Sequence, residues 1–91
     1  MPVQVRIPSV LRRQTRGEEV VSLDGATIGD VLEGLETRYE GLKGKLRGPQ
    51  GEIRRFVNIY INDSDVRLLK GAITPVADGD EVTIIPAVAG G

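Results

Sequence analysis

Alternation of apolar and polar residues predicts β-strands near both ends of the chain and in its middle. The strongest predicted strand covers residues 56–62, in which Val57, Ile59 and Ile61 share one side. The other predicted strands cover residues 3–7, 18–23, 66–68 and 82–85. Pro86 follows the last of these strands and is expected to end sheet pairing, because proline has no N–H group to donate.

A different spacing of apolar residues predicts one amphipathic helix that begins after Thr27 and ends at Gly41. Its apolar stripe comprises Ile28, Val31, Leu32, Leu35 and Tyr39. Thr27 is expected to cap the helix by accepting a hydrogen bond from the backbone N–H near Asp30. The residues that lie off the stripe and are expected to face water are Asp30, Glu33, Glu36, Thr37 and Glu40.

The segment from residue 41 to residue 52 is expected to be a loop, because it contains several glycines and Pro49. Leu42 and Leu46 lie about one helical turn apart, which is compatible with a short helical piece inside the segment. We expect this segment to be the least ordered part of the interior of the chain.

The predicted elements follow the order strand, strand, helix, strand, short strand and strand. One helix can cover one face of a single sheet, and the first and last strands are expected to lie side by side at its centre. This arrangement is an α+β fold of the β-grasp, ubiquitin-like type. It has a mixed sheet of about five strands on one main helix and a free C-terminal tail, residues 87–91. The length of 91 residues suits a single domain, residues 1–91, with one core.

The composition excludes most enzyme chemistry that depends on side chains. The chain has no cysteine and no histidine, which excludes disulfides, thiol nucleophiles, histidine-based triads and zinc sites of the Cys/His type. Carboxylate pairs, a lysine base or a serine–lysine pair remain, but a small core disfavours a desolvated site of that kind. We therefore expect a protein that is not itself an enzyme.

Charge and hydropathy argue against nucleic-acid and membrane partners. The net charge is -1 and aromatic residues make up 3% of the chain, unlike a basic surface with stacking aromatics. No apolar run reaches the roughly 20 residues that span a bilayer. The N-terminal residues lack the basic and apolar regions of a signal peptide, so we expect a cytoplasmic location.

Three segments together resemble the MoaD/ThiS family of sulfur-carrier proteins. They are residues 26–32, residues 56–67 and the C-terminal block from Asp78 to Gly91. The last block combines an acidic glycine turn, an apolar strand, a proline and the sequence Val-Ala-Gly-Gly. The resemblance covers nearly the whole chain, and the ending from Pro86 to Gly91 is most similar to the CysO-like branch. It implies the β-grasp fold and a role in sulfur transfer.

The resemblance implies a cycle that partner enzymes carry out. An E1-like adenylating enzyme would use ATP and magnesium to activate the terminal carboxylate, and a sulfur donor would displace AMP to leave a thiocarboxylate on Gly91. A second partner, such as a pyridoxal-phosphate-dependent cysteine synthase, would transfer that sulfur into cysteine or another thiolated metabolite. A metal-dependent protease is a further candidate partner, and no bound cofactor is expected on the carrier itself.

Elementary chemistry explains why such a carrier needs no reactive side chain. A carboxylate is a poor acyl electrophile because its leaving group would be oxide, whereas an acyl-adenylate has a good leaving group. Gly91 is therefore the expected reacting residue, and Gly90 is slim enough to enter a channel that a Cβ atom would block. Ala87, Val88 and Ala89 are expected to enter the partner's active site with them; the alternative is an ordinary tail without contacts.

A second candidate site is the side of residues 56–62 that faces away from the predicted core. Phe56 and Tyr60 on this side would face solvent, and exposed aromatic residues are typical of contact surfaces. With Ile85 and Pro86 they would form the patch that the activating enzyme docks on. The alternative is that the long loop covers Phe56 and leaves only Tyr60 exposed.

Arginines form two basic clusters in the predicted loops. One comprises Arg12, Arg13 and Arg16, and the other comprises Arg54 and Arg55. These side chains are either solvated loop residues or partners of acidic patches on other proteins, where they would tune association rate and specificity. The sequence leaves both interpretations open.

Three other functions are compatible with the same features. The small subunit of a molybdopterin synthase would use the same carrier chemistry but would bind a large catalytic subunit. A ubiquitin-like protein modifier would join its carboxylate to a lysine of a target protein. A passive interaction module of this shape would keep its function without the last two glycines.

Overall fold

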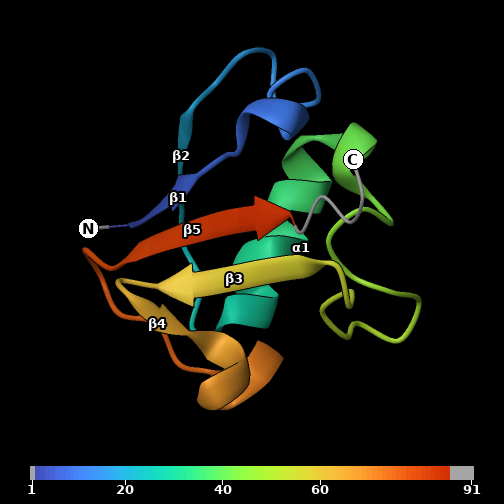
Figure 1. The fold of residues 1–91 in the computed structure, drawn as a ribbon. Coiled ribbons are helices and arrows are strands. Elements are labelled where there is room, and N and C mark those ends of the chain that lie inside the picture. Colours follow the sequence, from blue (N-terminus) through green and yellow to red (C-terminus); the bar gives the residue numbers. More distant parts are fainter. Residues whose placement is uncertain (1, 87–91) are drawn as a thin grey trace.

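Five strands form one mixed sheet, and one helix lies across one face of it (Figure 1). The computed structural model describes residues 2–86 of the chain. The strands and the α-helix of this part are β1 (Val3–Arg6), β2 (Val20–Leu23), α1 (Ile28–Arg38), β3 (Val57–Ile61), β4 (Ser64–Asp65) and β5 (Glu81–Pro86), and four short 3-10 helices lie between them. The expected free tail, residues 87–91, lies outside the described residues.

The strand order β2-β1-β5-β3-β4 places the first and last strands side by side, as predicted. β1 and β5 pair in parallel, with Val5 opposite Val82. β1 pairs with β2, and β3 pairs with β5 and β4, in the antiparallel direction. Element order, strand directions and the single helix confirm the predicted β-grasp arrangement.

The core lies between α1 and the sheet. Alternate residues of β3 and β5 are buried against the helix, as the period of a strand requires: Val57, Ile59, Ile61, Val82 and Ile84. The helix contributes the predicted apolar stripe of Ile28, Val31, Leu32 and Leu35. Complete burial of side chains of this size contributes roughly 1.5–3 kcal/mol each, so these contacts hold the helix on the sheet.

Local capping fixes the first turn of α1. Thr27 Oγ1 accepts a hydrogen bond from the Asp30 N–H at 3.2 Å, and Asp30 Oδ2 accepts one from the Thr27 N–H at 3.2 Å. This reciprocal pair is a capping box and confirms the predicted cap.

The helix ends at Arg38, earlier than the predicted stop at Gly41, and a short 3-10 helix, Glu40–Leu42, follows it. No helix within residues 2–86 is long and apolar enough to cross a membrane.

The predicted strand over residues 66–68 is wrong. The strand β4 comprises only Ser64–Asp65, and Val66–Leu68 forms a 3-10 helix. The Asp65 carboxylate accepts a hydrogen bond from the Arg67 N–H at 2.9 Å, which caps this turn in place of a strand ladder. Val66 is fully buried and anchors the turn on the core.

The prediction that Glu36 faces water is also wrong. Glu36 is 8% exposed, and its carboxylate accepts two hydrogen bonds from Arg47, at 3.2 Å from Nε and 2.6 Å from Nη2. The hydrogen bonds to Glu36 raise the pKa of Arg47 above its ordinary value, and burial opposes them. This bidentate ion pair ties the segment that follows the helix to the helix itself.

The predicted loop between residues 41 and 52 contributes two buried side chains to the core. Leu42 and Leu46 are both fully buried, although only Leu42 belongs to a short helix. Arg47 and Ile53 form an isolated antiparallel bridge, and the Arg54 N–H donates to the Leu46 carbonyl at 3.0 Å. The segment is therefore a packed connection that returns the chain to the start of β3.

Candidate functional site

One face of the sheet carries no helix, and we call it the open face (Figure 1). Residues that alternate with the core positions of the strands point to this side. In the central strands they are Gln4, Arg6, Asn58, Tyr60, Glu81, Thr83 and Ile85. A mostly polar strip with a few apolar side chains therefore runs beside the end of β5.

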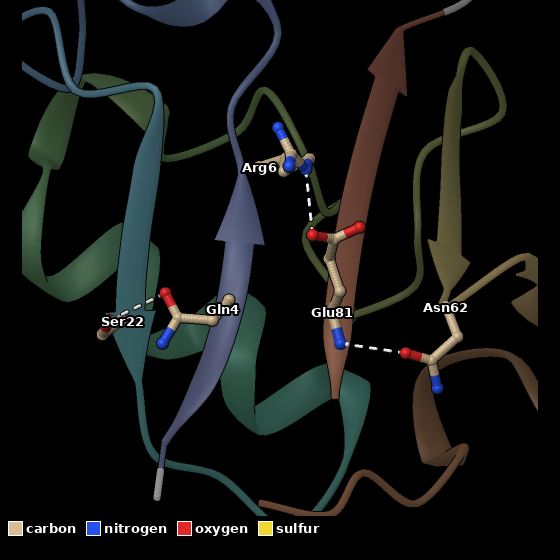
Figure 2. A network of polar contacts seen from close by, with 5 residues as sticks. All are labelled: Gln4, Arg6, Ser22, Asn62 and Glu81. Atoms are coloured by element: carbon tan, nitrogen blue, oxygen red, sulfur yellow. Dashed lines mark hydrogen bonds and ion pairs between the residues drawn. The ribbon is translucent and has the colours of Figure 1, made fainter. Parts of the chain in front are cut away.

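Polar contacts tie the strands of the open face together (Figure 2). Arg6 Nε donates to Glu81 Oε2 at 3.0 Å, which links β1 to β5. Asn62 Oδ1 accepts from the Glu81 N–H at 3.1 Å, which links the start of β5 to the turn after β3. Asn62 adopts φ 56°, a left-handed conformation that asparagine tolerates well. Sequence reasoning missed these residues; the only signal was their polar identity at positions opposite the core.

Tyr60 and Ile85, two residues of the predicted docking patch, lie close together on the open face. Tyr60 lies directly opposite Thr83 in the ladder between β3 and β5, and Ile85 is two residues farther along β5. These three side chains, with Asn62 and Asp63, line a hollow of about 220 Å³. Ile85 is 46% exposed, so it offers apolar area to a partner.

Phe56 is exposed but does not join Tyr60 in this hollow. It lies in the turn before β3, is 54% exposed and lines a separate hollow of about 700 Å³ with Arg54, Arg55 and Arg67. The alternative in which the loop covers Phe56 is wrong. The two aromatic residues of the prediction are thus separated, with Phe56 in the turn before β3 and Tyr60 within β3.

The end of β5 pairs with β3 on one side and borders a hollow on the other. Pro86, the last described residue, lies opposite Val57 in the sheet, and Val57 directly follows Phe56 in the sequence. On the other side, Ile85 and Pro86 line a hollow of about 260 Å³ with Arg6, Arg12 and Glu19. Arg12 also donates from Nε to the Ile7 carbonyl at 3.1 Å, so this arginine has a structural role as well.

The remaining predicted site residues are Ala87, Val88, Ala89, Gly90 and Gly91, and they lie outside the described residues. Within residues 2–86, no group of three or more acidic side chains is placed to hold a metal ion. The part of the predicted site that the structure describes is therefore the surface around the end of β5.

Comparison with known proteins shows the family to which the chain belongs. The sequence model of the ThiS family matches residues 5–91. The chain belongs to the ThiS family. This confirms the resemblance to sulfur carriers that the motifs indicated.

Similar proteins and a solved structure agree with this membership. The sulfur carrier protein CysO of Mycobacterium tuberculosis is 52% identical, with 100% of both chains covered. A chain in the crystal structure of the BexX/CysO complex of Amycolatopsis orientalis matches with a TM-score of 0.90 and 45% identity, over 98% of this chain and 99% of that one. The small archaeal modifier protein 3 of Haloferax volcanii is 47% identical, over 75% of this chain and 73% of its own.

In this ThiS-family protein the open face and the end of β5 lie on one continuous side of the sheet. Tyr60 and Ile85 lie on this side, and Pro86 ends β5 opposite Val57, the residue that follows Phe56. Full-length similarity to CysO supports a role in sulfur carriage.

Proposed function

We propose that this protein is a sulfur carrier whose Gly91 carboxylate becomes a thiocarboxylate. The observation that carries the proposal is the 52% identity to the sulfur carrier protein CysO over the full length of both chains. The absence of cysteine and histidine fits this chemistry, because the sulfur is held on the main chain and partner enzymes supply the acids, bases and metals.

The proposed chemistry has two steps on the carrier. The Gly91 carboxylate attacks the α-phosphorus of ATP in an E1-like enzyme, which releases pyrophosphate and forms an acyl-adenylate. A hydrosulfide ion (HS⁻) then attacks the carbonyl carbon, AMP leaves with the electron pair of the broken C–O bond, and the S–H proton is lost to solvent. The product is a C(O)S⁻ group that is nucleophilic through sulfur. A biosynthetic partner takes this sulfur into cysteine or another thiolated metabolite.

The folded part of the chain serves to present Gly91 in this scheme. β5 pairs with β1 from Glu81 to Thr83 and with β3 as far as Pro86, which lies opposite Val57, so the sheet fixes the position of Pro86. Tyr60 and Ile85 supply apolar contact area beside that point. Because the reacting group lies on the main chain, specificity must come from how the partner recognises this surface.

The test of the proposal is a mass measurement. Incubation with the adenylating enzyme of the same organism, ATP, magnesium and a sulfur source should raise the intact mass by about 16 Da, the replacement of one oxygen by sulfur. The control omits ATP and should show no change. The proposal fails if the mass stays constant with an enzyme preparation that converts another carrier protein under the same conditions.

Tyr60→Ala should weaken binding to the adenylating enzyme about tenfold and leave the fold intact, because truncation of an interface aromatic typically costs at least 1–2 kcal/mol. Calorimetric titration gives the affinity, and a thermal melt checks the fold. Ile73→Ala is the control, since Ile73 is an exposed apolar residue away from the open face. If Tyr60→Ala unfolds the domain, Tyr60 is a core residue and the docking assignment is wrong.

Two recipients of the sulfur are distinguished by the proteins that co-purify with the carrier. A pyridoxal-phosphate-dependent cysteine synthase would place the protein in cysteine formation. A large catalytic subunit that holds the C-terminal residues would identify it as the small subunit of a molybdopterin synthase. A metal-dependent protease in the same complex would indicate processing of the C-terminal end.

A role as a protein modifier is the second candidate, and the 47% identity to the small archaeal modifier protein 3 favours it. The same adenylation would activate Gly91, but a lysine amine of a target protein would attack the carbonyl in place of sulfur. Recovery of isopeptide-linked conjugates from cells would support this function. A search that finds thiocarboxylate but no conjugates would favour sulfur carriage alone.

A further inference from the structure

The hollow beside Phe56 has a chemical character of its own, and we call it the basic hollow. Its volume is about 700 Å³, and the side chains that give it this character are Glu52, Arg54, Arg55, Phe56 and Arg67. It lies between the segment that precedes β3 and the 3-10 helix Val66–Leu68. Tyr60 and Ile85 do not line the basic hollow, so it is a second area next to the proposed docking surface around those two residues.

The charge of the basic hollow is uncompensated. Three arginines face one glutamate, and the Glu52 carboxylate already accepts a hydrogen bond from the Gln50 N–H at 3.0 Å. None of the three arginines forms an ion pair with another residue of 2–86, whereas Arg6, Arg12 and Arg47 each do. The guanidinium groups of Arg54 and Arg55 are therefore available to carboxylates of another protein.

Arg67 organises this hollow from within. Its Nη2 donates to the carbonyls of Arg54 at 3.0 Å, Arg55 at 2.8 Å and Val57 at 2.8 Å, and its Nη1 donates to the side chain of Asn58. One guanidinium therefore holds the backbone of the turn that carries Arg54, Arg55 and Phe56. The positions from which these three side chains extend are set before any partner arrives, which lowers the entropic cost of binding.

The position of the basic hollow in the fold indicates which partner protein would contact it. Phe56 directly precedes Val57, and Val57 lies opposite Pro86 in the sheet. A protein that receives the residues after Pro86 must therefore approach the molecule beside this hollow. Its surface there must match a net positive patch with one apolar ring, which calls for acidic side chains.

We propose that the basic hollow docks an acidic segment of the protein that receives the C-terminal residues; this inference rests on the proposed function. Arg54 and Arg55 pair with carboxylates of that segment, and Phe56 packs against its apolar atoms. Arg67 is a positioning residue, because its guanidinium is committed to the backbone of the turn. Charge pairs of this kind act chiefly on association rate and on register.

The test compares two double variants with the same change in net charge. Arg54→Glu with Arg55→Glu reverses the basic hollow, and Lys43→Glu with Lys45→Glu reverses two exposed charges of the nearby segment that lie outside it. Stopped-flow measurements with the adenylating enzyme of the same organism give the association rate constant at several salt concentrations. Thermal melts check that both variants are folded.

At low salt, the variant in the basic hollow should associate about tenfold more slowly than the wild type, and the lysine variant should stay within about twofold. The difference should vanish near 1 M salt, where charges are screened within about 3 Å. Glu52→Gln removes the one acidic side chain of the hollow and should speed association about two- to threefold. Equal slowing by both double variants, or no slowing by either, would overturn the proposal.

The association measurement, combined with the mass measurement of sulfur transfer, separates this inference from the proposed function. If the wild type binds the enzyme with the predicted charge dependence but never gains sulfur, the proposed function fails and the docking site stands. If the wild type gains sulfur and the variant in the basic hollow gains it at the same rate at low salt, the docking site fails and sulfur carriage stands.

Discussion

Removal of Gly91, or addition of one residue after it, is expected to abolish thiocarboxylate formation without a change in the thermal midpoint. One added residue moves the terminal carboxylate by up to about 3.5 Å. A displacement of only about 1 Å at a reacting centre can cost about a hundredfold in rate. Intact-mass spectrometry measures the sulfur transfer, and calorimetry measures the thermal midpoint.

Two matched variants make this result specific. A residue added before Met1 lengthens the chain equally at the other end and should leave sulfur transfer unchanged. Gly91→Ala keeps the length and the carboxylate but adds a Cβ atom, so it should slow the reaction if the channel is as narrow as we infer. Full activity of the chain without Gly91 would place the chemistry elsewhere. A large fall in the thermal midpoint would show that the end of the chain is packed on the domain.

Most of the fold was predictable because it depends on local patterns. The alternation of Val57, Ile59 and Ile61 identified the buried side of β3, and the structure buries all three. The Thr27 cap needs only the residues of its own first turn, and it forms as expected. Patterns of this kind decide the element and its inner face before any tertiary contact is made.

Features that depend on distant contacts could not be predicted in this way. Glu36 lies off the apolar stripe, and its burial depends on Arg47, eleven residues later. The three residues Val66–Leu68 are too few to show a period, so their 3-10 conformation depends on the Asp65 cap and the burial of Val66. In both places a polar contact replaced the expected exposure or strand pairing.

The candidate site was predictable to a similar extent. Strand alternation identified Tyr60 and Ile85 as open-face residues, and sheet register brings them together. The separation of Phe56 from Tyr60 follows from the turn before β3, which Arg67 holds through carbonyls ten to thirteen residues earlier. No pattern in the sequence predicted that Arg67 contact, although it gives the basic hollow its form.

Leu46→Ala should lower the free energy of unfolding by about 2–4 kcal/mol, which is large for a domain of this size. Leu46 is 0% exposed, although it lies in the segment that sequence composition indicated as the least ordered. The control is Leu68→Ala, since Leu68 is 84% exposed and its truncation should change stability by less than about 0.5 kcal/mol. Urea denaturation followed by circular dichroism measures both values.

The same substitution connects stability with docking. The Leu46 carbonyl accepts the hydrogen bond from the Arg54 N–H at 3.0 Å, so a shift of the backbone at Leu46 also displaces Arg54. Leu46→Ala should therefore slow association with the adenylating enzyme under conditions in which the variant is still fully folded, and Leu68→Ala should not. If both leucine variants lower the free energy of unfolding by the same small amount, the segment is not packed as the structure shows. The inference that the turn next to Phe56 is pre-organised would then be wrong.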